Sequence, residues 1–313
     1  MTVPAADTAS LPPLYALPHA GGSALGAFPG WREALADLVR LEPLELPGHG
    51  RRVGEPFCET LRAAAADCAE RIARTAGGAP FALLGHSIGG LLAYELDALL
   101  HDRGGPAPAA VVIAGTPAPR PGPAAEAMLH TLSDDRFLAA VGELGGLPEA
   151  VLAHPEARTF HAELLRADYR LHERWAPADP PHRVGAPLLV LLAADDPLTR
   201  MDDAQRWRRF AARTLTTRIV PGAAHFFPVD RREETLAAVR AFLARVAWEP
   251  HRAAARNSAS AAAIASPCIK PTVASGPSAG SSSAAISMPS PNPPPSPAAE
   301  SANRSPRRSS PTA

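Results

Sequence analysis

The eight residues 83–90 read LLGHSIGG, and this stretch decides the fold class of the chain. The apolar run FALL ends directly before GHSIG, and the apolar segment LLAYELDALL follows it. A strand, a tight turn and a helix in this order are typical of the G-x-S-x-G turn, which exposes its serine at the carboxyl end of a strand. Gly85 and Gly89 leave room where the backbone folds back on itself, so we predict that Ser87 projects freely as a nucleophile.

Strand-like and helix-like segments alternate on both sides of this turn, through residues 1–250. Repetition of this kind predicts an α/β fold with a mostly parallel central sheet and helices on both faces. The strand-like runs are Leu14–Leu17, Leu44–Leu46, Phe81–Leu84, Val111–Ala114, Leu188–Leu192 and Arg218–Val220. The clearest helical patterns are Ala24–Val39, Leu91–Leu100 and Thr235–Val246.

Two regions depart from this alternation. Residues 117–181 contain the turn-rich PAPRPGP and helical patterns at Leu129–Val141 and Phe160–Trp175 but no convincing strand, so we predict a helical lid inserted into the domain. Residues 251–313 consist to about two-thirds of Ala, Ser and Pro, a composition that cannot bury enough apolar surface to order a chain. We therefore predict a disordered tail after a folded domain of residues 1–250.

Charge and cysteine content limit the possible partners. Residues 1–250 carry 25 Lys and Arg against 30 Asp and Glu, a mildly acidic balance that disfavours nucleic acid as a partner. The three cysteines Cys58, Cys68 and Cys268 lack the spacing of a disulfide framework or a zinc site, as expected in a reducing cytoplasm. The sequence has neither a signal peptide pattern nor about 18 uninterrupted apolar residues, so we expect no membrane association.

A serine hydroxyl needs a base and an acid to become a good nucleophile, and hydrolases with this turn supply them downstream in the order Ser, Asp, His. Asp195 and Asp196 end the apolar run that begins at Leu188, and His225 follows a later strand-like run. We favour Asp196, which directly precedes a proline at the turn, and keep Asp195 as the alternative. The other ten histidines are expected to be bystanders, with His86 packed beneath the turn.

An oxyanion formed at Ser87 needs two N–H donors. Hydrolases with this turn take one from the residue after the nucleophile, here Ile88, and one from the loop after an early strand. The segment LPHAGGSA (17–24) supplies such a loop, in which two glycines permit close approach of a ligand and Ala20 is the expected donor. Nucleophile, base, acid and donors together predict acyl-transfer chemistry.

Several phrases of the sequence together resemble the type II thioesterases associated with nonribosomal peptide and polyketide synthases. The resemblance spans residues 14–246, and the PHAGG loop and the phrases in the insertion are more specific than the serine turn. The phrases are LPHAGGSA, LPGHGRR, LLGHSIGG, LHTLSDDRFL, LRADYRLHERW, DDPLT and GAAHFFPVD.

The resemblance implies a stand-alone α/β-hydrolase that cleaves acyl or aminoacyl thioesters from the phosphopantetheine arm of carrier proteins. It assigns the triad to Ser87, Asp196 and His225, and the oxyanion hole to the N–H groups of Ala20 and Ile88. It implies that the partner is an acyl-loaded carrier protein. The acyl-transfer mechanism needs no cofactor or metal, and we expect a cytoplasmic monomer. Ala193 departs from the family, which commonly has a glycine three residues before the acid.

Two other functions stay open at this point. One is a different α/β-hydrolase activity, either an esterase or a cyclising terminal thioesterase, because one fold supports many reactions. The other is a carrier-binding protein that has kept the fold and lost the chemistry. Another hydrolase activity would differ from the thioesterase in its substrate, whereas a non-catalytic carrier-binding protein would keep its function when Ser87 is replaced.

Overall fold

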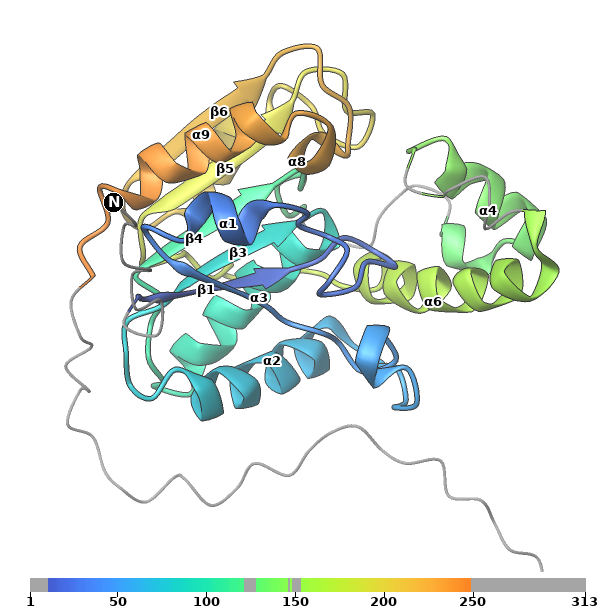
Figure 1. Cartoon of the computed structure of the whole chain (residues 1–313), viewed down its shortest axis with the longest axis horizontal. Helices are drawn as coiled ribbons and strands as arrows, with labels where there is room; N and C mark the ends of the chain where they lie inside the picture. Colours follow the sequence, from blue (N-terminus) through green and yellow to red (C-terminus); the bar gives the residue numbers. More distant parts are fainter. Residues whose placement is uncertain (1–10, 121–127, 146, 148–152, 249–313) are drawn as a thin grey trace, which may run out of the picture. The chain divides into compact units, whose positions relative to one another are not determined.

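The structure is a computed structural model that describes residues 11–120, 128–145, 147 and 153–248 (Figure 1). Its centre is a six-stranded sheet in the order β2-β1-β3-β4-β5-β6, and every pair of neighbouring strands in it is parallel. The predicted α/β class is thereby confirmed. The strands are β1 (Pro13–Leu17), β2 (Arg40–Pro43), β3 (Ala82–His86), β4 (Ala110–Ala114), β5 (Leu188–Ala193) and β6 (Leu215–Val220).

Helices cover both faces of this sheet, with α1 and α9 on one face and α2 and α3 on the other (Figure 1). The sheet is apolar on both sides because successive residues of a strand point to opposite faces. In β4, Val111 and Ile113 join the core with α2 and α3, whereas Val112 and Ala114 join the core with α1 and α9. The helix bounds are α1 (Trp31–Leu35), α2 (Leu61–Thr75), α3 (Ile88–Asp102) and α9 (Arg232–Leu243).

A helical insertion, residues 117–181, lies between β4 and β5. Its described residues form η3 (Leu129–Thr131), α4 (Asp134–Gly142) and α6 (Pro155–Glu173) and contain no strand. They bury a small core of their own, formed by Phe137, Leu138, Val141, Ala162 and Leu165. Residues 121–127, 146 and 148–152 lie outside the described part of the chain, as does the predicted tail at 251–313.

The predicted strand at Leu44–Leu46 is wrong, because β2 occupies Arg40–Pro43 instead. β2 is an edge strand that pairs only with β1, so its charged residues reach solvent while the strand stays paired. Arg40 and Glu42 lie on the same side of this strand and form an ion pair at 2.7 Å. The apolar Leu44 is also buried, but it lies in the loop that follows β2 and not in a strand.

The predicted helix at Ala24–Val39 is also wrong over most of its length, because only Trp31–Leu35 is helical. Gly30 has φ +73°, a left-handed conformation that a right-handed helix cannot contain. The preceding residues form turns and still bury Phe28 against Trp31, with ring centroids 5.6 Å apart. The helical spacing of apolar residues therefore identified residues that are buried, although most of the segment is not a helix. The remaining short helical turns are η2 (Gly50–Arg52), α7 (Asp203–Arg206), η4 (Trp207–Phe210) and α8 (Phe227–Asp230).

Candidate active site

Ser87 lies in the turn between β3 and α3 and has φ +59°, the only positive φ of a non-glycine residue in the described chain. Two glycines make this turn possible. A Cβ added at Gly85 would lie 2.0 Å from the carbonyl oxygen of Gly89, and one at Gly89 would lie 2.2 Å from the carbonyl oxygen of Leu17. Neither contact is sterically possible with backbone atoms, so the turn needs glycine at both positions.

Hydrogen bonds hold the strained backbone of Ser87 in place. Its N–H donates to the carbonyl of Ala114 at 2.8 Å, and the hydroxyl of Thr116 donates to its carbonyl at 2.8 Å. Thr116 is itself fixed by the indole N–H of Trp207, which donates to the Thr116 carbonyl at 3.1 Å. A non-glycine residue in such a conformation costs about 1–3 kcal/mol, and it persists where its surroundings fix it.

The structure brings Ser87, His225 and Asp196 into one hydrogen-bonded chain. The Nε2 atom of His225 lies 2.9 Å from the Ser87 hydroxyl oxygen, and its Nδ1 atom lies 2.9 Å from the Asp196 carboxylate. A carboxylate only accepts, so Nδ1 carries the proton and Nε2 is free to accept one from the hydroxyl. Asp196 is 4% exposed and also accepts from the N–H of Leu198, whereas the alternative acid Asp195 is exposed.

Two further histidines surround the His225 loop. His86 is fully buried, and its Nε2–H donates to the backbone carbonyl of His225 at 2.9 Å. Burial lowers the pKa of His86 well below its usual range. Burial, followed by the proximity of His225, lowers the pKa of His19 to about 4. Both rings are therefore neutral near pH 7, and neither adds a positive charge that would oppose protonation of His225.

Ala20 and Ile88 are the residues whose N–H groups the sequence predicts as oxyanion donors. Ile88 is the first residue of α3, where the N–H groups of a helix lack internal partners and favour negative charge. The contact of Gly89 with Leu17 places this helix start against the end of β1, which leads directly to Ala20. The hydrogen bonds found among the described residues use the N–H of neither Ala20 nor Ile88. Neither N–H is thus engaged by an acceptor among the described residues, as a predicted oxyanion donor requires.

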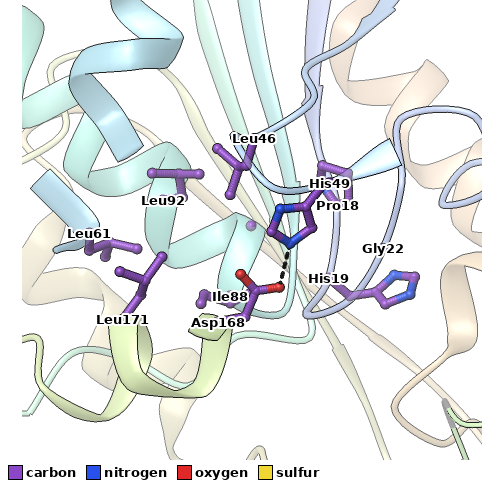
Figure 2. Close-up of a pocket in the computed structure, with 11 residues that line it drawn as sticks. Pro18, His19, Gly22, Leu46, His49, Leu61, Ile88, Leu92, Asp168 and Leu171 are labelled. Atoms are coloured by element: carbon purple, nitrogen blue, oxygen red, sulfur yellow. Dashed lines mark hydrogen bonds and ion pairs between the residues drawn. The ribbon is translucent and has the colours of Figure 1, made fainter. Parts of the chain in front are cut away.

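A second group of polar residues near this site was not anticipated from the sequence. Asp168 of α6 accepts from the N–H of Gly21 at 2.7 Å, and the same oxygen lies 2.9 Å from Nε2 of His49. Asp168, His49 and Ile88 border a small cavity (Figure 2). The phrases LPGHGRR and LRADYRLHERW contain His49 and Asp168, but nothing in the sequence pairs residues 119 positions apart.

The described residues include no group of three or more His, Cys, Asp or Glu side chains arranged to hold a metal ion. Nor does any helix among them have the length and apolar character needed to cross a membrane. The polar groups that converge at the end of the sheet are the hydroxyl, imidazole, carboxylate and N–H groups described above. This set can form and stabilise a tetrahedral intermediate at a carbonyl carbon.

Residues 12–243 match the family described as "Thioesterase domain". The chain belongs to the thioesterase family. It is 30% identical over 227 residues to the thioesterase PikA5 of Streptomyces venezuelae, covering 71% of this chain and 77% of PikA5. It is also 35% identical over 234 residues to the antimetabolite synthetase AmbE of Pseudomonas aeruginosa, covering 74% of this chain but only 11% of that much longer protein.

Solved structures of thioesterases share the fold. ClbQ, from the colibactin nonribosomal peptide and polyketide pathway, aligns with a TM-score of 0.69 and 33% identity over 75% of this chain and 98% of ClbQ. The RedJ thioesterase of the prodiginine pathway of Streptomyces coelicolor aligns with a TM-score of 0.66 and 34% identity over 76% of this chain and 94% of RedJ. The resemblance noted in the sequence is thereby confirmed, and the thioesterase has the α/β-hydrolase fold.

Proposed function

We propose that this thioesterase removes misprimed or stalled acyl and aminoacyl groups from the phosphopantetheine arm of carrier proteins in a nonribosomal peptide or polyketide synthase. The hydrogen-bonded chain Ser87–His225–Asp196 in a member of the thioesterase family carries the proposal. The pathways named for ClbQ and RedJ support the choice of partner. We further propose that the enzyme is a cytoplasmic monomer and requires neither cofactor nor metal.

In the proposed first half-reaction, the Ser87 oxygen attacks the thioester carbonyl while Nε2 of His225 takes the hydroxyl proton. Asp196 holds the imidazole in the required tautomer and stabilises its positive form. The N–H groups of Ala20 and Ile88 stabilise the oxyanion. The C–S bond then breaks, and the thiol of the phosphopantetheine arm leaves with the proton returned by His225. The product is an ester between the acyl group and Ser87.

In the second half-reaction, water replaces the thiol. His225 takes a proton from the water molecule as the water oxygen attacks the ester carbonyl. His225 then gives this proton to the Ser87 oxygen as the C–O bond of the ester breaks. The free acid leaves and the enzyme returns to its starting state. Neither half-reaction changes an oxidation state, and both use the same base and donors.

The test measures acyl release from a phosphopantetheinylated carrier protein loaded with short acyl groups. The same acyl group on free pantetheine serves as the comparison substrate. We expect Ser87→Ala to reduce release by about 10³-fold or more, because the covalent route is then closed. Release from the Ser87→Ala variant at the parent rate, well above the rate without enzyme, would show that the covalent mechanism is wrong. Release by the parent no faster than without enzyme would favour a non-catalytic carrier-binding protein. Equal activity on simple esters, without preference for the carrier, would favour an esterase.

The match to part of a large synthetase favours a second candidate, a terminal thioesterase that releases a finished product. The two functions differ in the acyl group that they accept. An editing enzyme releases short acyl groups from many carriers, whereas a terminal enzyme prefers one full-length intermediate. Comparing release of acetyl and of a peptidyl group from the same carrier protein separates them.

A further inference from the structure

Two loops at the carboxyl ends of β1 and β2 lie side by side next to the catalytic serine. The β1 loop, residues 18–24, contains Ala20, and the β2 loop, residues 44–52, contains His49. A buried carboxylate of the β2 loop ties them together at one end. Glu45 accepts from the N–H of Ala24 at 2.7 Å and from the N–H of Arg51 at 3.3 Å.

A second carboxylate ties the same two loops together, but it comes from the insertion. Asp168 in α6 accepts from the N–H of Gly21 at 2.7 Å. The same side chain contacts His49 at 2.9 Å, as Figure 2 shows. The side chains of Asp168 and His49 are only 4% and 5% exposed. The β1 loop therefore has one anchor that is part of the sheet domain and another that exists only while α6 is seated.

The geometry defines the protonation of this second anchor. Nδ1 of His49 lies 3.0 Å from the carbonyl oxygen of Pro47, which can only accept, so Nδ1 carries a proton. Its Nε2 faces the carboxylate of Asp168, which the N–H of Gly21 also stabilises. Burial disfavours the imidazolium, but the hydrogen bond and charge of Asp168, the Pro47 carbonyl and the charge of Glu45 outweigh it and raise the pKa of His49. The pair is an imidazolium and a carboxylate.

Apolar packing strengthens the same contact. Leu165 lies one helical turn before Asp168, on the same face of α6. A Cβ added at Gly21, which has φ +71°, would lie 2.7 Å from Leu165. Ala20 packs against the small core of the insertion, which includes Leu165. The helix thus contacts both residues of the Ala20–Gly21 peptide, and among these contacts only the carboxylate makes a hydrogen bond, to the N–H of Gly21. The N–H of Ala20 belongs to the preceding His19–Ala20 peptide, which shares the Cα of Ala20, so fixing the N–H of Gly21 restrains the N–H of Ala20 through this shared atom.

We propose that Asp168, paired with His49, is a positioning residue that holds the Ala20 N–H in place for the oxyanion only while α6 is seated on the β1 loop. The inference rests on the proposed function, which assigns an oxyanion donor to Ala20. Seating of the insertion is then a condition for the chemical step as well as for substrate binding. A pair that served stability alone would not affect the transition state selectively.

Asp168→Asn tests this, because it keeps the shape of the side chain and places either an N–H₂ group or a weaker acceptor against two donors. We expect kcat to fall roughly 10- to 100-fold with KM nearly unchanged, since a misplaced oxyanion donor weakens only the transition state. Affinity for a trifluoromethyl ketone analogue of acyl-pantetheine, which forms an oxyanion on Ser87, should fall in parallel. Affinity for the corresponding thioether, which has no carbonyl, should stay the same.

Glu173→Gln is the matched control. Glu173 also lies on α6 and also forms a buried pair with a histidine, His130, but that pair lies within the insertion and away from the β1 loop. We expect this variant to lose stability and to keep both kcat and affinity for the ketone. If Asp168→Asn behaves like Glu173→Gln, the Asp168 pair is only structural and the proposal is overturned.

A milder variant keeps the test decisive if Asp168→Asn fails to fold. His49→Gln retains a donor toward Asp168 and removes the charge, so we expect a smaller fall in kcat, about 3- to 10-fold, with a matching loss of ketone affinity. Unchanged ketone affinity in folded His49→Gln would overturn the proposal. Activity retained by Ser87→Ala would instead overturn the proposed function, so the two failures are distinct.

Discussion

The two halves of the candidate site are held in place by different means. Ser87, Asp196 and His225 follow three parallel strands of one sheet, and the hydrogen bonds that fix the Ser87 backbone come from the strand region beside it. Ala20 lies in a loop whose second anchor comes from α6, 147 residues further along the chain. Nucleophile and base are therefore built into the sheet, whereas half of the proposed oxyanion hole depends on how a separate helical segment packs.

The largest expected effect comes from replacing Asp196, the acid in the half of the site that the sheet holds. Asp196→Asn keeps the shape of the side chain but no longer holds His225 in the tautomer that accepts from Ser87, so we expect kcat to fall about 10⁴-fold. Acyl release from a loaded carrier protein measures the effect. The matched control is Asp195→Asn, because Asp195 is exposed and its carboxylate takes no part in the chain. A larger loss in the control would assign the acid to Asp195.

A smaller effect, on stability, is expected from a side chain at Gly85 in the turn that holds Ser87. A Cβ at Gly85 would lie 2.0 Å from a carbonyl oxygen, so Gly85→Ala forces the turn and the start of α3 apart. We expect the free energy of unfolding to fall by at least about 3 kcal/mol, at the upper end for overpacking, measured by urea denaturation. Gly54→Ala is the control, since a Cβ at Gly54 meets nothing within 4 Å. Equal free energies of unfolding for Gly85→Ala and Gly54→Ala would contradict a turn that has no room for a side chain at Gly85.

The His49–Asp168 pair, which anchors the β1 loop to α6, should make stability depend on pH. The pKa of His49 is raised in the folded state above its ordinary value of 6.5. The stabilisation from its pair with Asp168 is therefore complete below pH 6.5 and is lost as pH rises through the folded pKa. We expect the parent to lose more stability than His49→Gln between pH 6 and pH 9, because only the parent contains the titrating imidazole of this pair.

Urea unfolding of the two proteins at each pH measures this difference, and the other titrating groups cancel in the comparison. His19 contributes with the opposite sign and at lower pH, because its pKa is lowered to about 4. The unfolded chain takes up that proton below pH 6.5 while the folded state resists it, so this contribution destabilises the protein as pH falls. Parallel stability curves for parent and His49→Gln above pH 6.5 would contradict an ionised His49–Asp168 pair.

The same division explains what the sequence could predict. β3, α3 and the strand ends before Asp196 and His225 produce local patterns, so the positions that the structure brings together at 2.9 Å were recognisable in advance. The edge strand β2 was misplaced because Arg40 and Glu42 interrupt its apolar pattern, and burial does not distinguish loop from strand for Leu44. The His49–Asp168 contact depends on packing between distant segments, for which a single sequence contains no signal.

The place of the insertion in the sheet also bears on protein engineering. β4 and β5 are hydrogen-bonded neighbours, paired from Val111 with Leu188 to Ala114 with Leu191, so the insertion leaves and re-enters the sheet at adjacent strands. Chimeric enzymes could therefore exchange this segment between relatives to alter which acyl groups are accepted. The transplanted segment would need a leucine and an aspartate at the positions of Leu165 and Asp168. A helix without them would cover the substrate but leave the β1 loop, which contains the proposed oxyanion donor Ala20, loosely held.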